Sequence, residues 1–225
     1  MPNVYTFKDF EGSSHRILID LVNRYASRRG TLLDLGAAAG ELGSALRDRF
    51  EKTIGFEYNV DCVGELHGRF DQIVIADLER VKHLPDGMDA VVLADVLEHL
   101  RSPAHALDLV RRSLADGGRV FISVPNIANI TVRLGLLFGV FEYRDRGILD
   151  HTHLRFYTKR TIRREIERAG FRILATRGSS VPVRLIIGGF TPALILEPLE
   201  KVLAWTTRLW LGLFAYQIIM VAEKK

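Results

Sequence analysis

Two short stretches bring together side chains that can carry acid–base chemistry. The first contains Asp95, Glu98 and His99 in the spacing D-x-x-E-H, and the second contains His151 and His153. If a helical turn follows a strand ending near Asp95, the i, i+3 and i+4 spacing puts the first three side chains on one face. Alternation along the second stretch would direct both histidines to one side. Because imidazole titrates near neutral pH, we expect His151 or His153 to be the general base for a hydroxyl or amine.

A loop of small residues, LLDLGAAAGELG (32–43), lies between a predicted buried strand and a predicted helix. Such a loop lets a ligand approach the backbone, with amide donors and the helix dipole directed at it. Glu57 ends the next predicted strand, about 20 residues after Gly36, where a carboxylate can accept hydrogen bonds from both hydroxyls of a ribose. The combination predicts a site for a cofactor that contains a nucleoside.

Two other interpretations of the loop stay open. A tight strand-to-helix turn uses small residues without any ligand. A nicotinamide dinucleotide needs the spacing G-x-G-x-x-G so that its pyrophosphate can lie against the backbone, whereas this chain has Gly36, Ala38 and Gly40. The spacing therefore makes hydride transfer the weaker hypothesis.

The segments that must position these residues alternate between strand and helix patterns, which predicts an α/β fold with a parallel sheet. Short, apolar, β-branched runs predict strands covered on both faces at 31–35, 53–57, 72–76, 90–95 and 119–124. Helices are expected from Ser13 or Ser14, over 40–50, and over 102–118, where Gly117 and Gly118 would end the helix. A further helix is expected over 161–171, followed by strands over 172–177 and 215–225.

Composition narrows the class of protein. The 225 residues are 48% hydrophobic, which suits one domain with a sizeable core. The net charge of +4 is small, and the basic residues are dispersed, so we do not expect nucleic acid to be a partner. Cys62 is the single cysteine, which excludes an internal disulfide framework and favours a reducing compartment. Charges in the first sixteen residues oppose a secretion signal, so we expect a cytoplasmic protein.

The chain resembles the class I S-adenosylmethionine-dependent methyltransferases. Five stretches carry the resemblance in that family's order and spacing: LLDLGAAAGELG, GFEYN, IVIADLER, PDGMDAVVLADVLEHL and LADGGRVFISVPN. They cover roughly residues 12 to 178. The resemblance implies a single domain over 1–225, with S-adenosylmethionine as cofactor. It also implies a Rossmann-like, doubly wound sheet of seven mostly parallel strands, with the last strand antiparallel, helices on both faces and apolar helical insertions.

By matched position, Asp34, Gly36, Ala38 and Gly40 belong to the loop that holds the methionine part of the cofactor. The family usually has glycine where this chain has Ala38. Alanine disfavours positive φ and adds a methyl group near the ligand, so we expect Ala38 to lack positive φ. Ala38 is also the motif residue that favours a different hypothesis, a catalytically silent binding subunit that keeps the fold.

The other matched positions follow the next strands. The resemblance implies that Glu57 binds the ribose hydroxyls and that Asp77 contacts the adenine amino group. Leu78 would pack on the ring or present its backbone to it. Asp95 would lie near the methionine end and the transferred methyl group, which makes it a third catalytic candidate beside the two histidines.

A more specific hypothesis is that some of these residues form a metal site. The spacing D-x-x-E-H with a later D-H is similar to the metal-binding set of the small-RNA 2'-O-methyltransferases. That resemblance implies that Glu98, His99 and His151 hold a divalent ion such as Mg or Mn, acting as a Lewis acid on a hydroxyl. However, Asp95 replaces the first glutamate of the set, and LEHL also occurs in metal-free members of the superfamily. The alternative is that Glu98 caps or forms an ion pair while His99 packs beneath the cofactor loop.

Two apolar, aromatic insertions, 126–150 and 179–214, lie outside the shared core. They are expected to pack as a lid or substrate subdomain, or to form an interfacial surface. The longest uncharged run, 209–222, has about 14 residues, short of the roughly 20 that a spanning helix needs. Trp205, Trp210, Arg184 and Arg208 would suit peripheral contact with a membrane.

The stretches SVPN and DHTHLRFYT are also similar to those of bacterial methyltransferases of cell-surface polysaccharide and lipid biosynthesis. This resemblance implies O-methylation of a small molecule, a sugar, a glycolipid or a quinone-like precursor. An RNA 2'-O-methyltransferase with a metal is the second enzymatic hypothesis, although no RNA-binding module is recognisable. The oligomeric state stays open.

Overall fold

The computed structural model describes residues 12–26, 29–183 and 193–225, and Arg184 lies outside these ranges. Seven strands form one sheet in the order β3-β2-β1-β4-β5-β7-β6. The strands are β1 (Thr31–Leu35), β2 (Lys52–Glu57), β3 (Gln72–Ile75), β4 (Met88–Ala94), β5 (Leu114–Pro125), β6 (Phe171–Ser179) and β7 (Gln217–Lys224).

The direction of the strands confirms the predicted topology. β1 pairs in parallel with β2 and β4, and the parallel part continues to β3 on one side and to β5 on the other. The last strand, β7, lies between β5 and β6 and is antiparallel to both. The carboxyl ends of β1, β2, β3, β4 and β5 therefore meet at one edge of the sheet, where a ligand can reach several loops at once.

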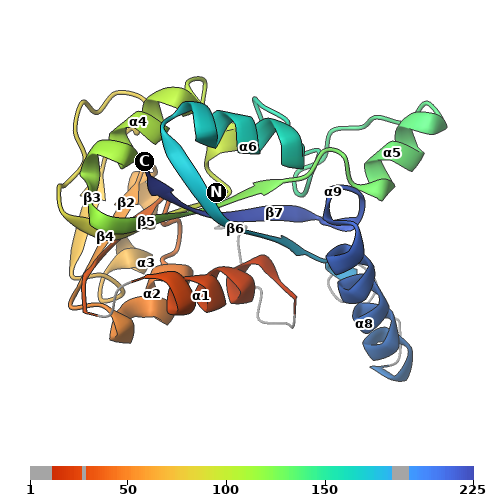
Figure 1. Cartoon of the computed structure of the whole chain (residues 1–225), viewed down its shortest axis with the longest axis horizontal. Coiled ribbons are helices and arrows are strands. Elements are labelled where there is room, and N and C mark those ends of the chain that lie inside the picture. The colour runs from red at the N-terminus through yellow and green to blue at the C-terminus, as the bar shows by residue number, and fades with distance from the viewer. Residues whose placement is uncertain (1–11, 27–28, 184–192) are drawn as a thin grey trace.

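Helices cover both faces of the sheet (Figure 1). One face carries α1 (Ser14–Tyr25), α2 (Glu41–Leu46) and α3 (Val63–Leu66), and the other carries α4 (Pro103–Ser113) and α6 (Lys159–Arg168). Each face has its own apolar core: Leu18 and Leu42 belong to the first, and Leu107 and Ile162 to the second. Because helices cover both faces of the sheet, residues on both sides of the central strands are buried, and the sequences of these strands are continuous apolar runs.

Local signals fix several helix boundaries. The Ser13 side chain caps α1 by accepting from the Arg16 amide, as predicted. Thr158 and Thr161 form a capping box at the start of α6. These caps satisfy backbone donors that have no partner within the helix.

Two predicted helices are shorter than expected. The helix over 102–118 ends at Ser113, because Leu114 already pairs with Met88 at the start of β5. Gly118 lies within this strand, where a Cβ would approach the Met88 carbonyl oxygen to 2.6 Å. Gly118 therefore permits the close pairing of β5 with β4 and does not end a helix. The segment 40–50 divides into α2 and a 3-10 helix, Arg47–Arg49.

Both insertions contain helices at the end of the molecule where β5 ends and β7 begins (Figure 1). Insertion 126–150 forms α5 (Ile130–Leu137), and the described part of 179–214 forms α8 (Ala193–Leu209) and α9 (Leu211–Phe214). In the view of Figure 1, α5 and α8 project in different directions. Among the described residues, none of the helices combines the length and the apolar character needed to cross a membrane.

Candidate active site

The small-residue loop after β1 is attached to β2 by its backbone. The amides of Gly36 and Ala37 both donate to the Phe56 carbonyl oxygen, at 2.8 and 3.1 Å. Gly36 has a φ of +74°, and a Cβ there would lie 2.6 Å from Val96 Cγ2. Packing against Val96 and the backbone conformation thus require glycine at this position, whether or not a ligand is bound.

Ala38 differs from the sequence-based expectation, because its φ is positive, at 48°. The conformation costs on the order of 1 kcal/mol for a residue with a Cβ. In return, the Ala38 amide donates to Glu57 Oε2 at 2.7 Å, a hydrogen bond to a charged group. Glu57 Oε1 accepts from the amides of Tyr58 and Asn59 at 2.9 and 2.8 Å. The expectation was wrong because the carboxylate of Glu57 stabilises a conformation that alanine alone disfavours.

Asp34 lies beneath this loop and is fully enclosed. Burial, together with the nearby negative charge of Glu57, raises the pKa of the Asp34 carboxyl to about 7, although a hydrogen bond from the Gly43 backbone opposes the shift. The Asp34 side chain is therefore held in the interior by α2, and its protonation responds to the charge of Glu57.

A cleft of about 780 Å³ opens at the carboxyl edge of the sheet. Its lining includes residues that follow β1, β2, β3 and β4, so the strand ends converge as the parallel topology requires. The predicted cofactor residues that line it are Gly36, Glu57, Asp77, Leu78 and Asp95. These residues are far apart in the sequence, and the fold brings them together around one cleft.

The loop after β3 presents Asp77 to the cleft. Asp77 Oδ1 accepts from the Glu79 amide at 2.9 Å, and Oδ2 lies 3.2 Å from Arg80 Nε. Leu78 is buried, and its side chain packs in the apolar core with Leu84. Of the two roles expected for Leu78, presentation of its backbone to the cleft agrees with this packing.

Asp95 follows β4 with a φ of 57°. Its carboxylate accepts a hydrogen bond from Ser123 Oγ at 2.9 Å and another from the Gln217 amide. Ser123 and Gln217 are both buried, and they come from β5 and from the start of β7. Sequence reasoning missed these two residues, although Gln217 could have been noticed as the polar residue that opens an otherwise apolar strand.

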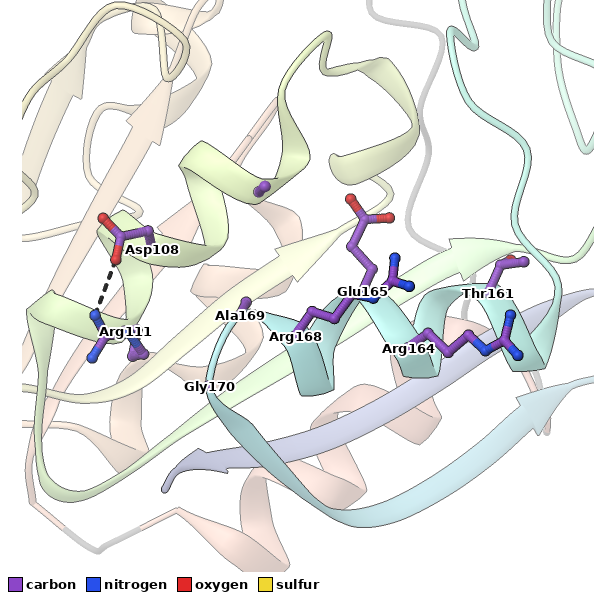
Figure 2. A pocket seen from close by; sticks show the side chains of 9 residues that line it. Asp108, Arg111, Thr161, Arg164, Glu165, Arg168, Ala169 and Gly170 are labelled. Atoms are coloured by element: carbon purple, nitrogen blue, oxygen red, sulfur yellow. Dashed lines mark hydrogen bonds and ion pairs between the residues drawn. The ribbon is translucent and has the colours of Figure 1, made fainter.

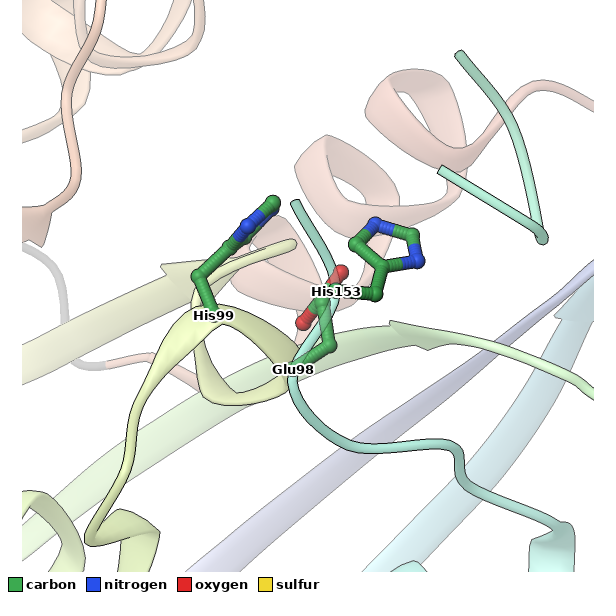
Figure 3. Close-up of side chains that lie close together, drawn as sticks. All are labelled: Glu98, His99 and His153. Atoms are coloured by element: carbon green, nitrogen blue, oxygen red, sulfur yellow. The ribbon is translucent and has the colours of Figure 1, made fainter. Parts of the chain in front are cut away.

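Glu98 and His99 lie in a 3-10 helix, Leu97–His99, directly after Asp95. The Glu98 carbonyl oxygen accepts from the amides of Leu154 and Arg155 at 2.8 and 3.0 Å, which holds the histidine loop against this helix. As a result, ligand atoms of Glu98, His99 and His153 lie within 4.8 Å of one another (Figure 3). We call these three residues the Glu98 cluster.

The metal hypothesis named His151, but the structure brings His153 to Glu98 and His99. Residues 150–153 form a turn in which the His153 amide donates to the Asp150 carbonyl oxygen at 3.1 Å. A turn does not direct alternate side chains to one side, so the two histidines separate. The His151 side chain is 60% exposed, and its Nδ1 lies 3.8 Å from Asp145 and 3.9 Å from Asp150.

Hydrogen bonds fix the proton positions on both clustered rings. His153 Nδ1 lies 3.1 Å from the Ile148 carbonyl oxygen, which can only accept, so Nδ1 carries the proton. His99 Nδ1 faces the carbonyl oxygen and the hydroxyl of Thr152, whose hydroxyl donates to Asp150 at 2.7 Å. Each Nε2 is consequently an acceptor in the neutral ring. Burial, followed by the nearby His99, lowers the pKa of His153, which favours that neutral form.

A second concavity, of about 740 Å³, lies between α4 and α6, away from the residues described above (Figure 2). Arg111, Arg164 and Arg168 contribute to its lining, and Arg111 forms an ion pair with Asp108 at 3.1 Å. None of the predicted catalytic or cofactor residues lines this groove. The candidate active site is therefore the cleft at the carboxyl edge.

Comparison with known proteins identifies the family of the chain. A family model described as a methyltransferase domain matches residues 10–176. The ubiquinone biosynthesis O-methyltransferase of Aeromonas salmonicida is 29% identical over 150 residues, which are 62% of this chain and 61% of that protein. The malonyl-[acyl-carrier protein] O-methyltransferase of Geobacter sulfurreducens is 30% identical over 156 residues, which are 63% of this chain and 55% of that protein. The matches thus span little more than half the length of these curated relatives.

The fold is similar to that of solved structures. A SAM-dependent methyltransferase from Archaeoglobus fulgidus superimposes with a TM-score of 0.61 at 19% identity, and the match covers 94% of this chain and 95% of that one. The family match spans the five sequence motifs and the cleft that they surround. The chain therefore belongs to the class I methyltransferase family, whose enzymes use S-adenosylmethionine as cofactor.

Proposed function

We propose that the chain is an O-methyltransferase that acts on a hydroxyl of a small-molecule, sugar or lipid-linked acceptor. The observation that carries the proposal is the Glu98 cluster at the rim of the cleft: His99 lines the cleft, and the His153 ring lies 4.8 Å from the His99 ring. An oxygen nucleophile needs a base or an electrophile near the transferred methyl group, and this cluster offers both kinds of group.

The cleft residues fit S-adenosylmethionine. The volume of about 780 Å³ lies in the range of nucleotide-sized sites. Glu57 offers carboxylate oxygens to ribose hydroxyls, and Asp77 offers a carboxylate oxygen to an adenine amino group. Asp95 also lines the cleft, and it precedes Glu98 by three residues in the sequence. When bound, the cofactor supplies a methyl group on a positively charged sulfur. The role of the chain is then to orient the acceptor oxygen and to take its proton.

His153 is the proposed base. Its Nδ1–H is held by the Ile148 carbonyl oxygen, which leaves Nε2 as the proton acceptor. In the proposed role, Nε2 of His153 would take the proton of the acceptor hydroxyl as its oxygen receives the methyl group that the bound cofactor would supply. The negative charge of Asp150 acts to raise the pKa of His153 and can stabilise the imidazolium that forms, whereas the nearby His99 opposes it.

A second candidate function is supported by the same cluster. One carboxylate and two imidazoles with ligand atoms within 4.8 Å of one another suit a divalent cation. Glu98, His99 and His153 would hold it, and the ion would act as a Lewis acid on the acceptor hydroxyl. Such a site supports the hypothesis of RNA 2'-O-methylation with a metal, in which His153 is a ligand and not the base.

The test is transfer of a labelled methyl group to a panel of phenols, sugars and lipid-linked alcohols. We expect His153→Asn to reduce turnover by roughly a hundredfold or more, the usual contribution of a general base. Asparagine keeps a donor near the position of Nδ1 but removes Nε2. Binding of S-adenosylhomocysteine should be unchanged, and the exposed His67 offers the matched control His67→Asn.

The possible outcomes separate the hypotheses. Turnover that survives a chelator supports His153 as the base, whereas turnover lost with a chelator and restored by Mg or Mn supports the metal. Equal turnover in His153→Asn and the wild type would refute both roles. Binding of S-adenosylhomocysteine without transfer to any acceptor would favour the silent binding subunit.

A further inference from the structure

Helix α8 carries an apolar stripe on the side that faces solvent. With 3.6 residues per turn, five residues spaced along the helix fall within an arc of about 80°. All five are exposed, and they are Leu194, Pro198, Val202, Trp205 and Leu209. We call these residues the α8 stripe. An exposed apolar strip of this length is unusual, because it gains nothing from the core of its own chain.

The opposite side of α8 already packs against the protein. Leu196 and Thr207 are each 3% exposed and lie on that side. Thr207 also approaches Gly178 of β6, where a Cβ would lie 3.1 Å from Thr207 Cγ2. The helix is therefore apolar on two sides, and attachment to the sheet accounts for only one of them. In the part of the chain that the structure describes, no residue buries the α8 stripe.

The charges next to the stripe indicate what can cover it. Lys201 and Arg208 lie along one border of the stripe, and both are exposed. The two acidic residues of the helix, Glu197 and Glu200, lie farther round the helix from the stripe. Long cationic side chains beside an apolar strip can reach anionic headgroups while the strip enters the acyl region.

A second projecting segment has the same character. Residues 134–143 comprise the second half of α5 and the residues that follow it. They expose a run of large apolar side chains, namely Leu134, Leu136, Leu137, Phe138, Val140, Phe141 and Tyr143. Three cations lie in or beside this segment, Arg133, Arg144 and Arg146, together with Glu142 and Asp145. Figure 1 shows α5 and α8 projecting at the end of the molecule where β5 ends and β7 begins. The active-site cleft is lined by residues at the carboxyl ends of the parallel strands, which lie along the same edge of the sheet.

We propose that the α8 stripe, together with residues 134–143, binds the surface of an anionic lipid bilayer. Trp205 and Trp210, 61% and 63% exposed, would lie at the headgroup level, where amphipathic rings are favoured. This arrangement holds the carboxyl edge of the sheet near the membrane. It deepens the proposed function because a lipid-linked acceptor would then reach the cleft from the bilayer.

The two tryptophans make the test direct, because the chain contains no others. Intrinsic fluorescence therefore reports on α8 and the residue that follows it. With vesicles of equal parts phosphatidylglycerol and phosphatidylcholine, we expect the emission to shift to shorter wavelength and to be quenched by brominated acyl chains. Pure phosphatidylcholine vesicles should produce a smaller change, and added salt should weaken the binding to anionic vesicles.

A matched pair of substitutions tests the location. Val202 in the stripe and Val60 after β2 are 55% and 66% exposed, so the same change to serine removes the same exposed side chain at both sites. We expect Val202→Ser to weaken vesicle binding by roughly fivefold, the effect of removing about one buried methyl group. Val60→Ser should bind vesicles like the wild type. Both variants are surface changes, and calorimetric binding of S-adenosylhomocysteine by Val202→Ser checks its fold.

Three results would overturn the proposal. The first is a wild-type emission spectrum that anionic vesicles leave unchanged. The second is equal vesicle binding by Val202→Ser and Val60→Ser. The third is a concentration-dependent dimer that Trp205→Ser dissociates while vesicles have no effect, which would show that a second copy of the chain covers the stripe. Because vesicle binding needs no methyl acceptor, these results are independent of whether the proposed O-methylation is correct.

Discussion

The buried carboxyl of Asp34 should make the stability of the protein depend on pH in a specific direction. Its pKa is raised from 3.8 to about 7 in the folded chain, first by burial and second by Glu57. Between these two values the folded state binds more protons than the unfolded state, so stability falls as pH rises. A displacement of about three units corresponds to about 4 kcal/mol, and the interval from pH 5 to pH 8 covers about 3 kcal/mol of it.

The substitution Asp34→Asn isolates this effect. Asparagine keeps an oxygen that can accept from the Gly43 amide but cannot ionise. We expect the stability of the variant relative to the wild type to increase by about 3 kcal/mol between pH 5 and pH 8. Urea unfolding at several pH values gives the difference directly, because all other titrating groups are common to both proteins.

Asp71 provides the control. Hydrogen bonds from the Thr53 backbone and hydroxyl hold the pKa of Asp71 below its usual value, so its contribution is present above about pH 4 and is lost only on further acidification. The stability difference between wild type and Asp71→Asn should therefore be flat from pH 5 to pH 8. Parallel pH profiles for wild type and Asp34→Asn would refute the account of the buried carboxyl.

The remaining predictions concern the loop and the support of Asp95. Gly36→Ala should destabilise the protein by about 2 kcal/mol or more, from positive φ and contact with Val96, and Val96→Ala should recover part of the loss in a double-mutant cycle. Ala38→Gly should stabilise it by about 0.5 kcal/mol in urea unfolding, whereas destabilisation would show that the methyl group packs usefully. Gln217→Leu removes a donor to the Asp95 carboxylate, so calorimetry should show S-adenosylhomocysteine binding weakened roughly fivefold; unchanged affinity would show that Ser123 alone suffices.

The sequence was sufficient for the sheet and for the residues at strand ends. β1 matches its prediction residue for residue, because a buried parallel strand bounded by turn residues leaves few alternatives. Gly36, Glu57, Asp77 and Asp95 follow strands whose carboxyl ends must meet, so their convergence in one cleft was also predictable.

What the sequence did not reveal depends on contacts between distant segments. The positive φ of Ala38 is stabilised by Glu57, which lies on the next strand. The choice of His153 over His151 depends on the turn at Asp150 and on two backbone bonds to Glu98. Gln217 reaches Asp95 across 122 positions of sequence. Patterns of local spacing carry no information about such contacts.

The central claim is that the cleft at the carboxyl edge holds the methyl donor through Glu57. Calorimetric titration of the full chain with S-adenosylhomocysteine tests it most directly, with Glu57→Gln as the variant and the exposed Glu51→Gln as the matched control. We predict micromolar binding for the wild type and the control, and a loss of roughly tenfold or more for Glu57→Gln, because a charged acceptor is replaced. Absence of binding by the wild type, or equal affinity in all three proteins, would contradict the account.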